Sequence, residues 1–106
     1  MDYPLPSNET YTIYCKSGCT YCIKAKILLS CQNPRTEIID CDKYLLTDVQ
    51  KEEFLEFIAG ISGEKYRTFP MIFHKGAFIG GFTELRKYND ELLQRINAFS
   101  DEIFKV

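Results

Sequence analysis

Residues 11–22 read YTIYCKSGCTYC and join a β-rich run to a helical pattern through a short turn. The run from Tyr11 to Cys15 has the composition of a central strand, and Ser17-Gly18 ends it. A helical pattern then extends from about Thr20 to Ser30. A strand that leads into a helix in this way is the first half of a βαβ unit, whose crossover is right-handed.

The following residues complete that unit and add a helix. We expect Asn33-Pro34 to close the first helix and Thr36 to Asp40 to form the second strand. Thr47 and Gln50 have the spacing of a capping box, which predicts the start of another helix. The expected face of this helix carries Lys51, Phe54, Ile58 and Ile61, and its expected end lies at Gly60 and Gly63.

A hairpin and a long helix end the predicted fold. Met71 to His74 and Ala77 to Gly80 read as strands joined by the tight turn Lys75-Gly76. The last helix should begin after the capping candidate Thr83. Its apolar stripe steps by three or four residues through Leu85, Tyr88, Leu92, Ile96, Phe99 and Ile103. The order βαβ, α, ββ, α predicts an α/β fold with a four-stranded mixed sheet flanked by helices.

Length and charge limit the classes of protein to consider. The 106 residues, with 13 basic and 15 acidic side chains, suit one domain of net charge −2. Residues 1–9 read as an extended lead-in and residues 10–106 as a single domain. Because the chain lacks both an eighteen-residue apolar run and a signal-like start, we expect a cytoplasmic protein. The absence of a Lys/Arg-rich cluster argues against nucleic-acid and membrane partners.

The chain carries five cysteines: Cys15, Cys19, Cys22, Cys31 and Cys41. In a reducing compartment, thiols serve as catalytic groups, metal ligands or buried side chains. Cys19 and Cys22 stand three residues apart at a helix start, within the spacing that a disulfide requires. Cys19 precedes the helix, where free N–H groups favour a thiolate, and is the candidate nucleophile. Cys22 begins an inward apolar stripe and can only resolve a bond that Cys19 has made.

The charges around these cysteines favour the same interpretation. No Asp or Glu occurs from Thr10 through Thr36, while this segment carries Lys16, Lys24, Lys26 and Arg35. A basic segment stabilises a thiolate and attracts anionic thiol substrates.

Metal binding is the competing use of these thiols. Cys15, Cys19 and Cys22 have the spacing that radical enzymes use for a four-iron cluster, but those enzymes have much longer chains. A zinc site would need a remote fourth ligand, which would be Cys31, Cys41 or His74. Simpler expectations are a small buried residue for Cys15, an inert thiol at a helix end for Cys31, a surface thiol for Cys41 and a plain strand residue for His74.

Three segments together resemble the signature segments of glutaredoxins of the dithiol type: Lys16 to Cys22 with its CTYC site, Arg67 to Pro70, and Gly80 to Leu85. The resemblance implies a thioredoxin-like fold and a cis Phe69-Pro70 bond. It further implies a monomer that uses glutathione to reduce glutathione mixed disulfides and protein disulfides. A ribonucleotide reductase or a glutathionylated enzyme would fit equally as the protein substrate.

Carried over by position, the resemblance makes Cys19 the nucleophile and Cys22 the resolving thiol. It implies a glutathione groove formed by Lys16, Tyr21, Arg67, Thr68, Phe69, Pro70, Gly81, Phe82 and Thr83. Independently of it, the N–H groups of Phe82 and Thr83 at a helix start suit a carboxylate.

The chain departs from the family pattern at Thr20, where Pro is usual, at Phe69, where Val is usual, and at Glu84, where Asp is common. Family members with a small hydroxyl residue at the first of these positions can hold a [2Fe-2S] cluster, as dimers with glutathione. An iron-sulfur scaffold or sensor is therefore the main alternative function. A thioredoxin-fold binding module with a silent pair of cysteines is a third.

Overall fold

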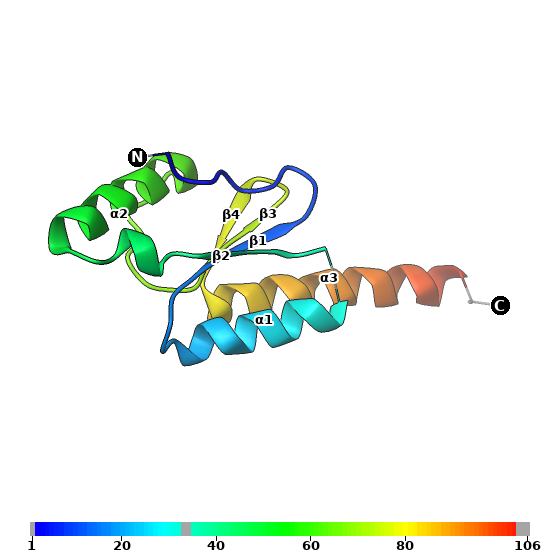
Figure 1. The fold of residues 1–106 in the computed structure, drawn as a ribbon. Helices are drawn as coiled ribbons and strands as arrows, with labels where there is room; N and C mark the ends of the chain where they lie inside the picture. Colours follow the sequence, from blue (N-terminus) through cyan, green and yellow to red (C-terminus); the bar gives the residue numbers. More distant parts are fainter. Residues whose placement is uncertain (1, 33–34, 104–106) are drawn as a thin grey trace.

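The computed structural model describes residues 2–32 and 35–103, and of residues 93–103 it describes the backbone alone. Its elements follow the predicted order (Figure 1). They are β1 (Tyr11–Cys15), α1 (Thr20–Gln32), β2 (Glu37–Asp40), the short 3₁₀ helix η1 (Asp42–Tyr44), α2 (Asp48–Ser62), β3 (Met71–His74), β4 (Ala77–Gly80) and α3 (Phe82–Ile103). Only η1 was not predicted.

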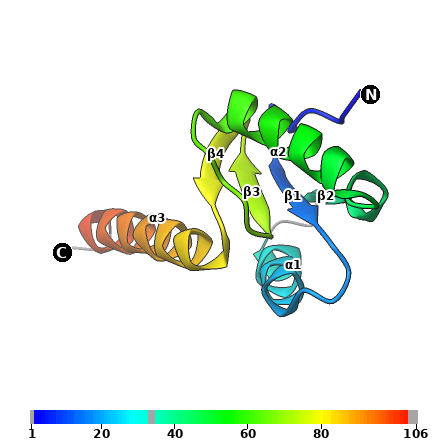
Figure 2. The same cartoon turned by 90° about the vertical axis from the view of Figure 1, so that its left-hand side faces the viewer.

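The sheet has the order β2-β1-β3-β4. β1 pairs in parallel with β2 and antiparallel with β3, and β3 pairs antiparallel with β4. The predicted four-stranded mixed sheet is confirmed. Helix α2 lies on one face of the sheet, and α1 and α3 lie on the other (Figure 2).

Alternating side chains of the central strands build one apolar core on each face. Ile13 and Cys15 of β1 face α1 and α3, whereas Tyr14 faces α2. The first core comprises Tyr11, Ile13, Cys15, Cys22, Ala25, Leu29, Ile72 and Leu85. The second comprises Tyr14, Cys41, Tyr44, Phe54, Leu55, Ile58, Met71 and Phe73. Because both faces of β1 and β3 are buried, these strands read as nearly continuous apolar runs.

The N-terminal segment packs on the α2 side. The Tyr3 ring lies edge-on to Tyr44 at 5.0 Å and to Phe54 at 5.4 Å. The hydroxyl of Tyr14 donates a hydrogen bond of 2.6 Å to the carbonyl of Pro4. The lead-in is thereby attached to the second core.

The boundaries of α2 differ in part from the prediction. Thr47 is the N-cap and accepts a hydrogen bond from the Gln50 N–H, as predicted. The reciprocal half of the capping box is not formed, since Gln50 Oε1 is buried without a hydrogen-bond partner. Gly60 lies inside the helix, and only Gly63, with φ of 81°, ends it. Lys51 is exposed, whereas Leu55 is buried. The buried face of α2 therefore carries Phe54, Leu55 and Ile58, which share one side of a helix with 3.6 residues per turn.

Helix α3 begins at Phe82, so Thr83 lies in its first turn and is not its cap. The N–H of Leu85 bonds the carbonyl of Gly81 at 2.9 Å, which makes Gly81 the residue before the helix. Of the predicted stripe, Leu85 is buried and Tyr88 and Leu92 are half-buried. The side chains of Ile96, Phe99 and Ile103, like the predicted break at Asn33-Pro34, lie outside the described residues.

The predicted turn between β3 and β4 is confirmed. Lys75 and Gly76 both have positive φ, 52° and 83°, as a two-residue hairpin turn of the primed type requires. Among the helices of the described ranges, none is long and apolar enough to cross a bilayer.

Candidate active site

Four connections meet at one end of the sheet. β1 and β2 are parallel and end there, β4 also ends there, and β3 begins there because it runs antiparallel to both of its neighbours. The segments that carry the predicted site residues follow β1, precede β3 and follow β4. The topology therefore brings together segments that are far apart in the sequence.

Cys19 occupies the N-cap of α1. Its sulfur accepts a hydrogen bond of 3.2 Å from the Cys22 N–H, and its carbonyl accepts one of 3.2 Å from the Ile23 N–H. A thiol in this position replaces the usual hydroxyl or carboxylate cap. The unpaired N–H groups of the first turn favour negative charge on the capping atom. The Cys19 side chain is only half-buried, so its sulfur is accessible at the start of the helix.

Cys22 faces the sheet, as predicted, and is 1% exposed. The pKa of Cys22 is raised to about 12, mainly by burial and secondly by the hydrogen bond with the Cys19 side chain. This thiol stays protonated at neutral pH and has no route to a bulky substrate. The two cysteines therefore differ in access, and Cys22 is held in its protonated form.

Phe69 forms the wall opposite Cys19. The Cys19 thiol lies 3.6 Å from the Phe69 carbonyl oxygen, to which it donates, and the Phe69-Pro70 bond is cis, as the resemblance implied. The Lys16 ammonium lies 5.6 Å from the centroid of the Phe69 ring. Stacking at 6.1 Å on Phe54 of α2 holds that ring in place. Lys16, Cys19 and Phe69 thus lie together.

Tyr21, Phe82 and Thr83 form the other side of the site. The Tyr21 and Phe82 rings are 6.0 Å apart, and all three residues line a hollow of about 400 Å³ between α1 and α3. Gly81 is buried just before α3, and a Cβ there would lie 2.6 Å from the Tyr66 hydroxyl. A larger residue at this position would require the Tyr66 hydroxyl to move.

Arg67 and Thr68 are exposed, and their side chains have partners on the α2 side of the site. The Arg67 guanidinium donates to both carboxylate oxygens of Glu52, at 3.0 and 2.6 Å. These hydrogen bonds lower the pKa of Glu52. The Thr68 side chain hydrogen-bonds to Tyr66. Sequence reasoning missed Glu52, because nothing in its spacing from Arg67 signals the contact.

Asp42 is a second residue that sequence reasoning missed. It accepts hydrogen bonds from the N–H of Ser17, at 2.9 Å, and from the Ser17 hydroxyl. These bonds lower the pKa of Asp42. A signal was available, since Asp42 follows a strand parallel to β1 and the two strands end at the same edge. Asp42 thereby anchors the loop that carries Cys19.

The remaining cysteines divide into buried and exposed thiols. Cys15 is 2% exposed, which confirms the prediction of a small buried residue, and Cys31 is exposed. The prediction of a surface thiol at Cys41 is wrong, since this side chain is fully buried. Its N–H bonds the Cys15 carbonyl at 2.8 Å, which extends the β1–β2 pairing and turns the thiol into the second core. Burial raises the pKa of Cys41 to about 12.

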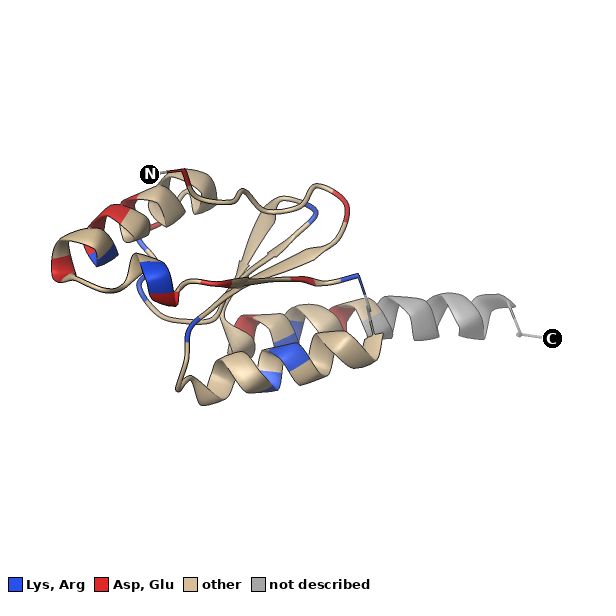
Figure 3. Ribbon diagram, in the orientation of Figure 1, with Lys and Arg blue, Asp and Glu red and all other residues tan. Residues whose placement is uncertain are grey.

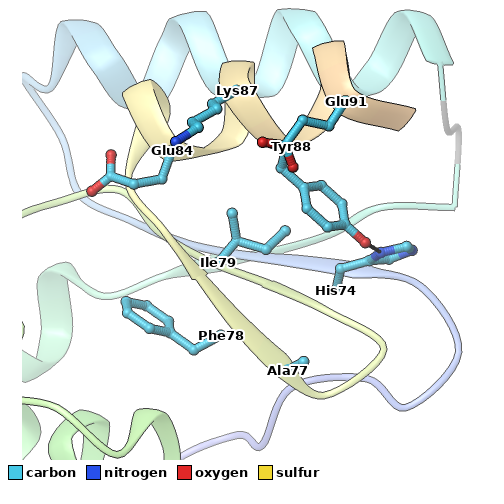
Figure 4. Close-up of a pocket in the computed structure, with 8 residues that line it drawn as sticks. All are labelled: His74, Ala77, Phe78, Ile79, Glu84, Lys87, Tyr88 and Glu91. Carbon is cyan, nitrogen blue, oxygen red and sulfur yellow. Dashed lines mark hydrogen bonds between the residues drawn. The ribbon is translucent and has the colours of Figure 1, made fainter. Parts of the chain in front are cut away.

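A separate hollow of about 360 Å³ lies between β4 and α3 (Figure 4). None of the predicted site residues lines it. His74 faces it from β3, where it stacks on Tyr11 at 4.0 Å and hydrogen-bonds to the Tyr88 hydroxyl through Nδ1 at 2.7 Å. His74 is a strand residue with structural partners, as predicted. Over the described part of the chain, no three His, Cys, Asp or Glu side chains are grouped as metal ligands.

Comparison with known proteins identifies the family of this chain. The glutaredoxin family model matches residues 11–79, which is more than half of the 106 residues. The chain is 32% identical over 85 residues to mitochondrial glutaredoxin-2 of Bos taurus, covering 80% of this chain and 50% of the relative. The chain therefore spans about half the length of this curated relative.

Solved structures agree with the sequence match. Glutaredoxin 1 of Francisella tularensis, in complex with cacodylate, superposes with a TM-score of 0.66 at 30% identity, over 79% of this chain and 95% of that one. A buckwheat glutaredoxin in complex with glutathione superposes with a TM-score of 0.58 at 26% identity, over 80% of this chain and 73% of that one. The thioredoxin-like fold is thus shown, and the chain belongs to the glutaredoxin family.

Proposed function

We propose that this chain is a glutathione-dependent thiol-disulfide oxidoreductase in which Cys19 is the nucleophile and Cys22 the resolving thiol. The observation that carries the proposal is the difference between the two thiols. Cys19 caps α1 and accepts an N–H, whereas Cys22 is buried directly beneath it. An accessible thiolate paired with a protected thiol is the arrangement that dithiol exchange needs.

With a glutathione mixed disulfide, the reaction uses Cys19 alone. The Cys19 thiolate attacks the glutathione sulfur, the new S–S bond joins Cys19 to glutathione, and the substrate leaves as its thiolate. A second glutathione thiolate then attacks the glutathione sulfur of this intermediate. Oxidised glutathione forms, and Cys19 is released as a thiolate.

With a protein disulfide, both cysteines react. Cys19 attacks one sulfur of the substrate, and the other leaves as a thiolate that can accept the Cys22 proton. Cys22 then attacks Cys19, which releases the reduced substrate and forms the Cys19–Cys22 disulfide. Because Cys22 is held beside Cys19, it competes well with glutathione from solution for this bulky intermediate. Two glutathione molecules reduce the disulfide and leave as oxidised glutathione.

Glutathione binding is supported by the chemistry at both ends of the site. The Lys16 ammonium beside Phe69 suits an anionic tripeptide, and the N–H groups at the start of α3 suit its carboxylate. The buckwheat glutaredoxin that was solved with glutathione has the same fold. We place Lys16, Tyr21, Phe69, Phe82 and Thr83 in the groove. Arg67 can join it only when Glu52 releases the guanidinium.

The test couples glutathione and glutathione reductase to NADPH consumption. The substrates are a small glutathione mixed disulfide and a protein disulfide. We expect Cys19→Ser to abolish both activities and Cys22→Ser to keep most of the first while losing most of the second. Cys31→Ser is the matched control and should keep both. A Cys22→Ser enzyme that is inactive on mixed disulfides would falsify the assigned roles.

The iron-sulfur alternative rests on Thr20 in place of the usual Pro. Since the described side chains of one chain provide no three-ligand group, a cluster would need a second chain and glutathione. Anaerobic reconstitution with iron, sulfide and glutathione tests this alternative. A coloured dimer that Thr20→Pro abolishes would support it, whereas a colourless monomer would support the oxidoreductase alone.

A further inference from the structure

A groove that begins at the glutathione site extends along α1 beyond the residues that the proposed reaction uses. Two hollows, of about 400 and 350 Å³, lie between α1 and α3 and share Lys24, Phe82 and Arg86. They form one continuous depression, the α1–α3 groove. Tyr21 and Thr83 line its end nearest to Cys19, and Ile27 and Leu28 line its far end, one to two helical turns further along α1.

The far part of the groove, around Ile27 and Leu28, is mainly apolar. Tyr21 is 56% exposed and Ile27 is 60% exposed. Phe82 and Leu28 are half-buried, and both pack against the first core. Isolated apolar side chains are common on protein surfaces, but a contiguous apolar strip next to a catalytic group indicates a contact surface.

Two cations border this apolar strip. The Lys24 ammonium lies 5.2 Å from the Tyr21 ring centroid, and the Arg86 guanidinium lies 6.0 Å from that of Phe82. Asp90 is the one acidic residue that lines the groove, so its described lining carries two positive charges and one negative charge. Figure 3 shows basic positions on both helices in this region.

We propose that the α1–α3 groove binds an acidic segment of the protein substrate that also carries an apolar side chain, next to the cysteine whose disulfide bond Cys19 breaks. The proposal rests on the proposed function, since it concerns the substrate of that same site. The apolar side chain would lie on Ile27 and Leu28. Acidic side chains would pair with Lys24 and Arg86.

The reach of the groove distinguishes this ligand from glutathione. Lys24 and Ile27 stand five and eight residues beyond Cys19, which corresponds to about 8–12 Å along a helix. An extended chain covers about 3.3 Å per residue, so the second to fourth residues from a bound cysteine reach this part of the groove. A tripeptide that occupies the site around Phe69 and Thr83 does not. Only a longer substrate reaches the far part of the groove, around Lys24 and Ile27.

The experiment uses synthetic peptides that carry glutathione on a single cysteine. In one peptide the second to fourth residues on each side of the cysteine are Glu and Leu, in a second Lys replaces Glu, and in a third Ser replaces Leu. We expect kcat/KM for the Glu/Leu peptide to exceed that for the Lys/Leu peptide at least fivefold. Added salt should reduce this ratio, because it screens exposed charges.

Variants locate the preference in the groove. Arg86→Glu, which changes the net charge of the groove lining from about +1 to about −1, should reverse the charge preference, and Ile27→Asp should remove the advantage of Leu over Ser. Lys51→Glu and Val49→Asp, at exposed positions of α2, are the matched controls and should change neither. Activity on a small glutathione mixed disulfide should be the same in all of these proteins.

Equal kcat/KM for all three peptides in the wild-type protein would overturn the groove proposal, as would a preference that survives the charge reversal. Neither result would affect the proposed function as long as the small mixed disulfide is still reduced. Loss of that basal reaction in the wild-type protein would instead overturn the proposed function. The two failures are therefore distinguishable.

Discussion

At the scale of single residues, the environments of the thiols differ from one another far more than their sequence contexts suggest. Cys22 and Cys41 are both buried, with pKa values raised to about 12 mainly by burial. An ordinary exposed thiol titrates near about 8.5, so at neutral pH the thiolate fraction of either buried cysteine is lower by about three-thousandfold. Cys31 is exposed on α1.

This contrast predicts the order of alkylation. With iodoacetamide at neutral pH, native protein should be labelled at Cys31 and at Cys19, and at least a hundredfold more slowly at Cys22 and Cys41. Mass spectrometry of peptides over time measures the rates. In guanidinium chloride the buried cysteines should lose this protection. Labelling of Cys41 as fast as Cys31 in native protein would contradict its burial.

Glu52 gives a second prediction at this scale. Its carboxylate holds the Arg67 guanidinium through two hydrogen bonds, and both side chains are 57% exposed. If Arg67 serves the glutathione groove, Glu52 competes with the tripeptide carboxylate for it. Glu52→Gln should then lower KM for glutathione. An exposed pair contributes about 0.2–1 kcal/mol, so the change should be at most about fivefold.

Steady-state kinetics with varied glutathione measure this effect. Glu56→Gln is the matched control, because Glu56 lines the same hollow beside Arg67, whereas the ion pair of Arg67 in the described structure is with Glu52. Its KM should match the wild type. A higher KM in Glu52→Gln would show that the ion pair positions Arg67 for glutathione instead of withholding it.

At the scale of elements, the loop between β1 and α1 depends on η1. Asp42 accepts hydrogen bonds from Ser17, which lower its pKa in the folded protein. A carboxyl group whose pKa is lowered by folding stabilises the fold above its unfolded pKa of about 3.9, and this stabilisation is lost as pH falls through the folded pKa. Ser17→Ala removes one of the two donors.

Ser17→Ala should therefore lower the free energy of unfolding at neutral pH, and its deficit relative to wild type should shrink as pH falls below about 4. Urea unfolding followed by circular dichroism at several pH values measures this difference. Ser30→Ala is the matched control, since the Ser30 hydroxyl bonds only a carbonyl of its own helix. A deficit independent of pH would exclude Asp42 as the partner that matters.

Local signals predicted most of the elements, and the errors have physical causes. The turn Lys75-Gly76 and the cap Thr47 were predictable because the residues themselves make the bonds. The prediction of a helix end at Gly60 is wrong, because α2 continues through it. The packed face of α2 outweighs the helix-propensity cost of one glycine, which is about 1 kcal/mol. Cys41 was misplaced because its burial depends on the pairing of β2 with β1, which is not a local property.

At the scale of the whole molecule, the site could be predicted only in part. The places of Cys19 and Cys22 follow from the strand-to-helix junction, which one continuous segment encodes. The contacts of Cys19 with Phe69, and of Arg67 with Glu52, join residues that the sheet topology brings together. The positions of these residues in the sequence do not indicate the contacts. For the residues around Phe69 and Thr83, the prediction therefore relied on resemblance to the family.

Stability of the whole fold should depend on pH through His74, which lies on the face of the sheet opposite α2. Its ring stacks on Tyr11 and hydrogen-bonds to Tyr88, and α3 presents Glu84, Lys87 and Glu91 to the same hollow (Figure 4). Burial, followed by the charge of Lys75, lowers the pKa of His74. The net effect of these groups is that folding favours the neutral imidazole.

The sign of the effect follows from linkage. An unfolded histidine titrates near about 6.5, so below this pH the unfolded chain binds a proton that folded His74 binds less readily. The contribution of His74 to stability is thus fully present above about 6.5 and is lost as pH falls through its folded pKa. One proton can lower the free energy of unfolding by at most about 1.4 kcal/mol per pH unit.

His74→Gln, which carries no titrating group, tests this prediction. Between about pH 7.5 and 5, the free energy of unfolding of the wild type should fall further than that of the variant. Urea unfolding reports it through tyrosine fluorescence, since the chain has seven tyrosines and no tryptophan. His74 pairs with Tyr11 at the start of β1, whereas Cys19 follows the end of β1 and lines no part of this hollow. Reduction of a small glutathione mixed disulfide at neutral pH should therefore be unchanged. Parallel stability curves for the two proteins would mean that His74 titrates alike in the folded and unfolded states.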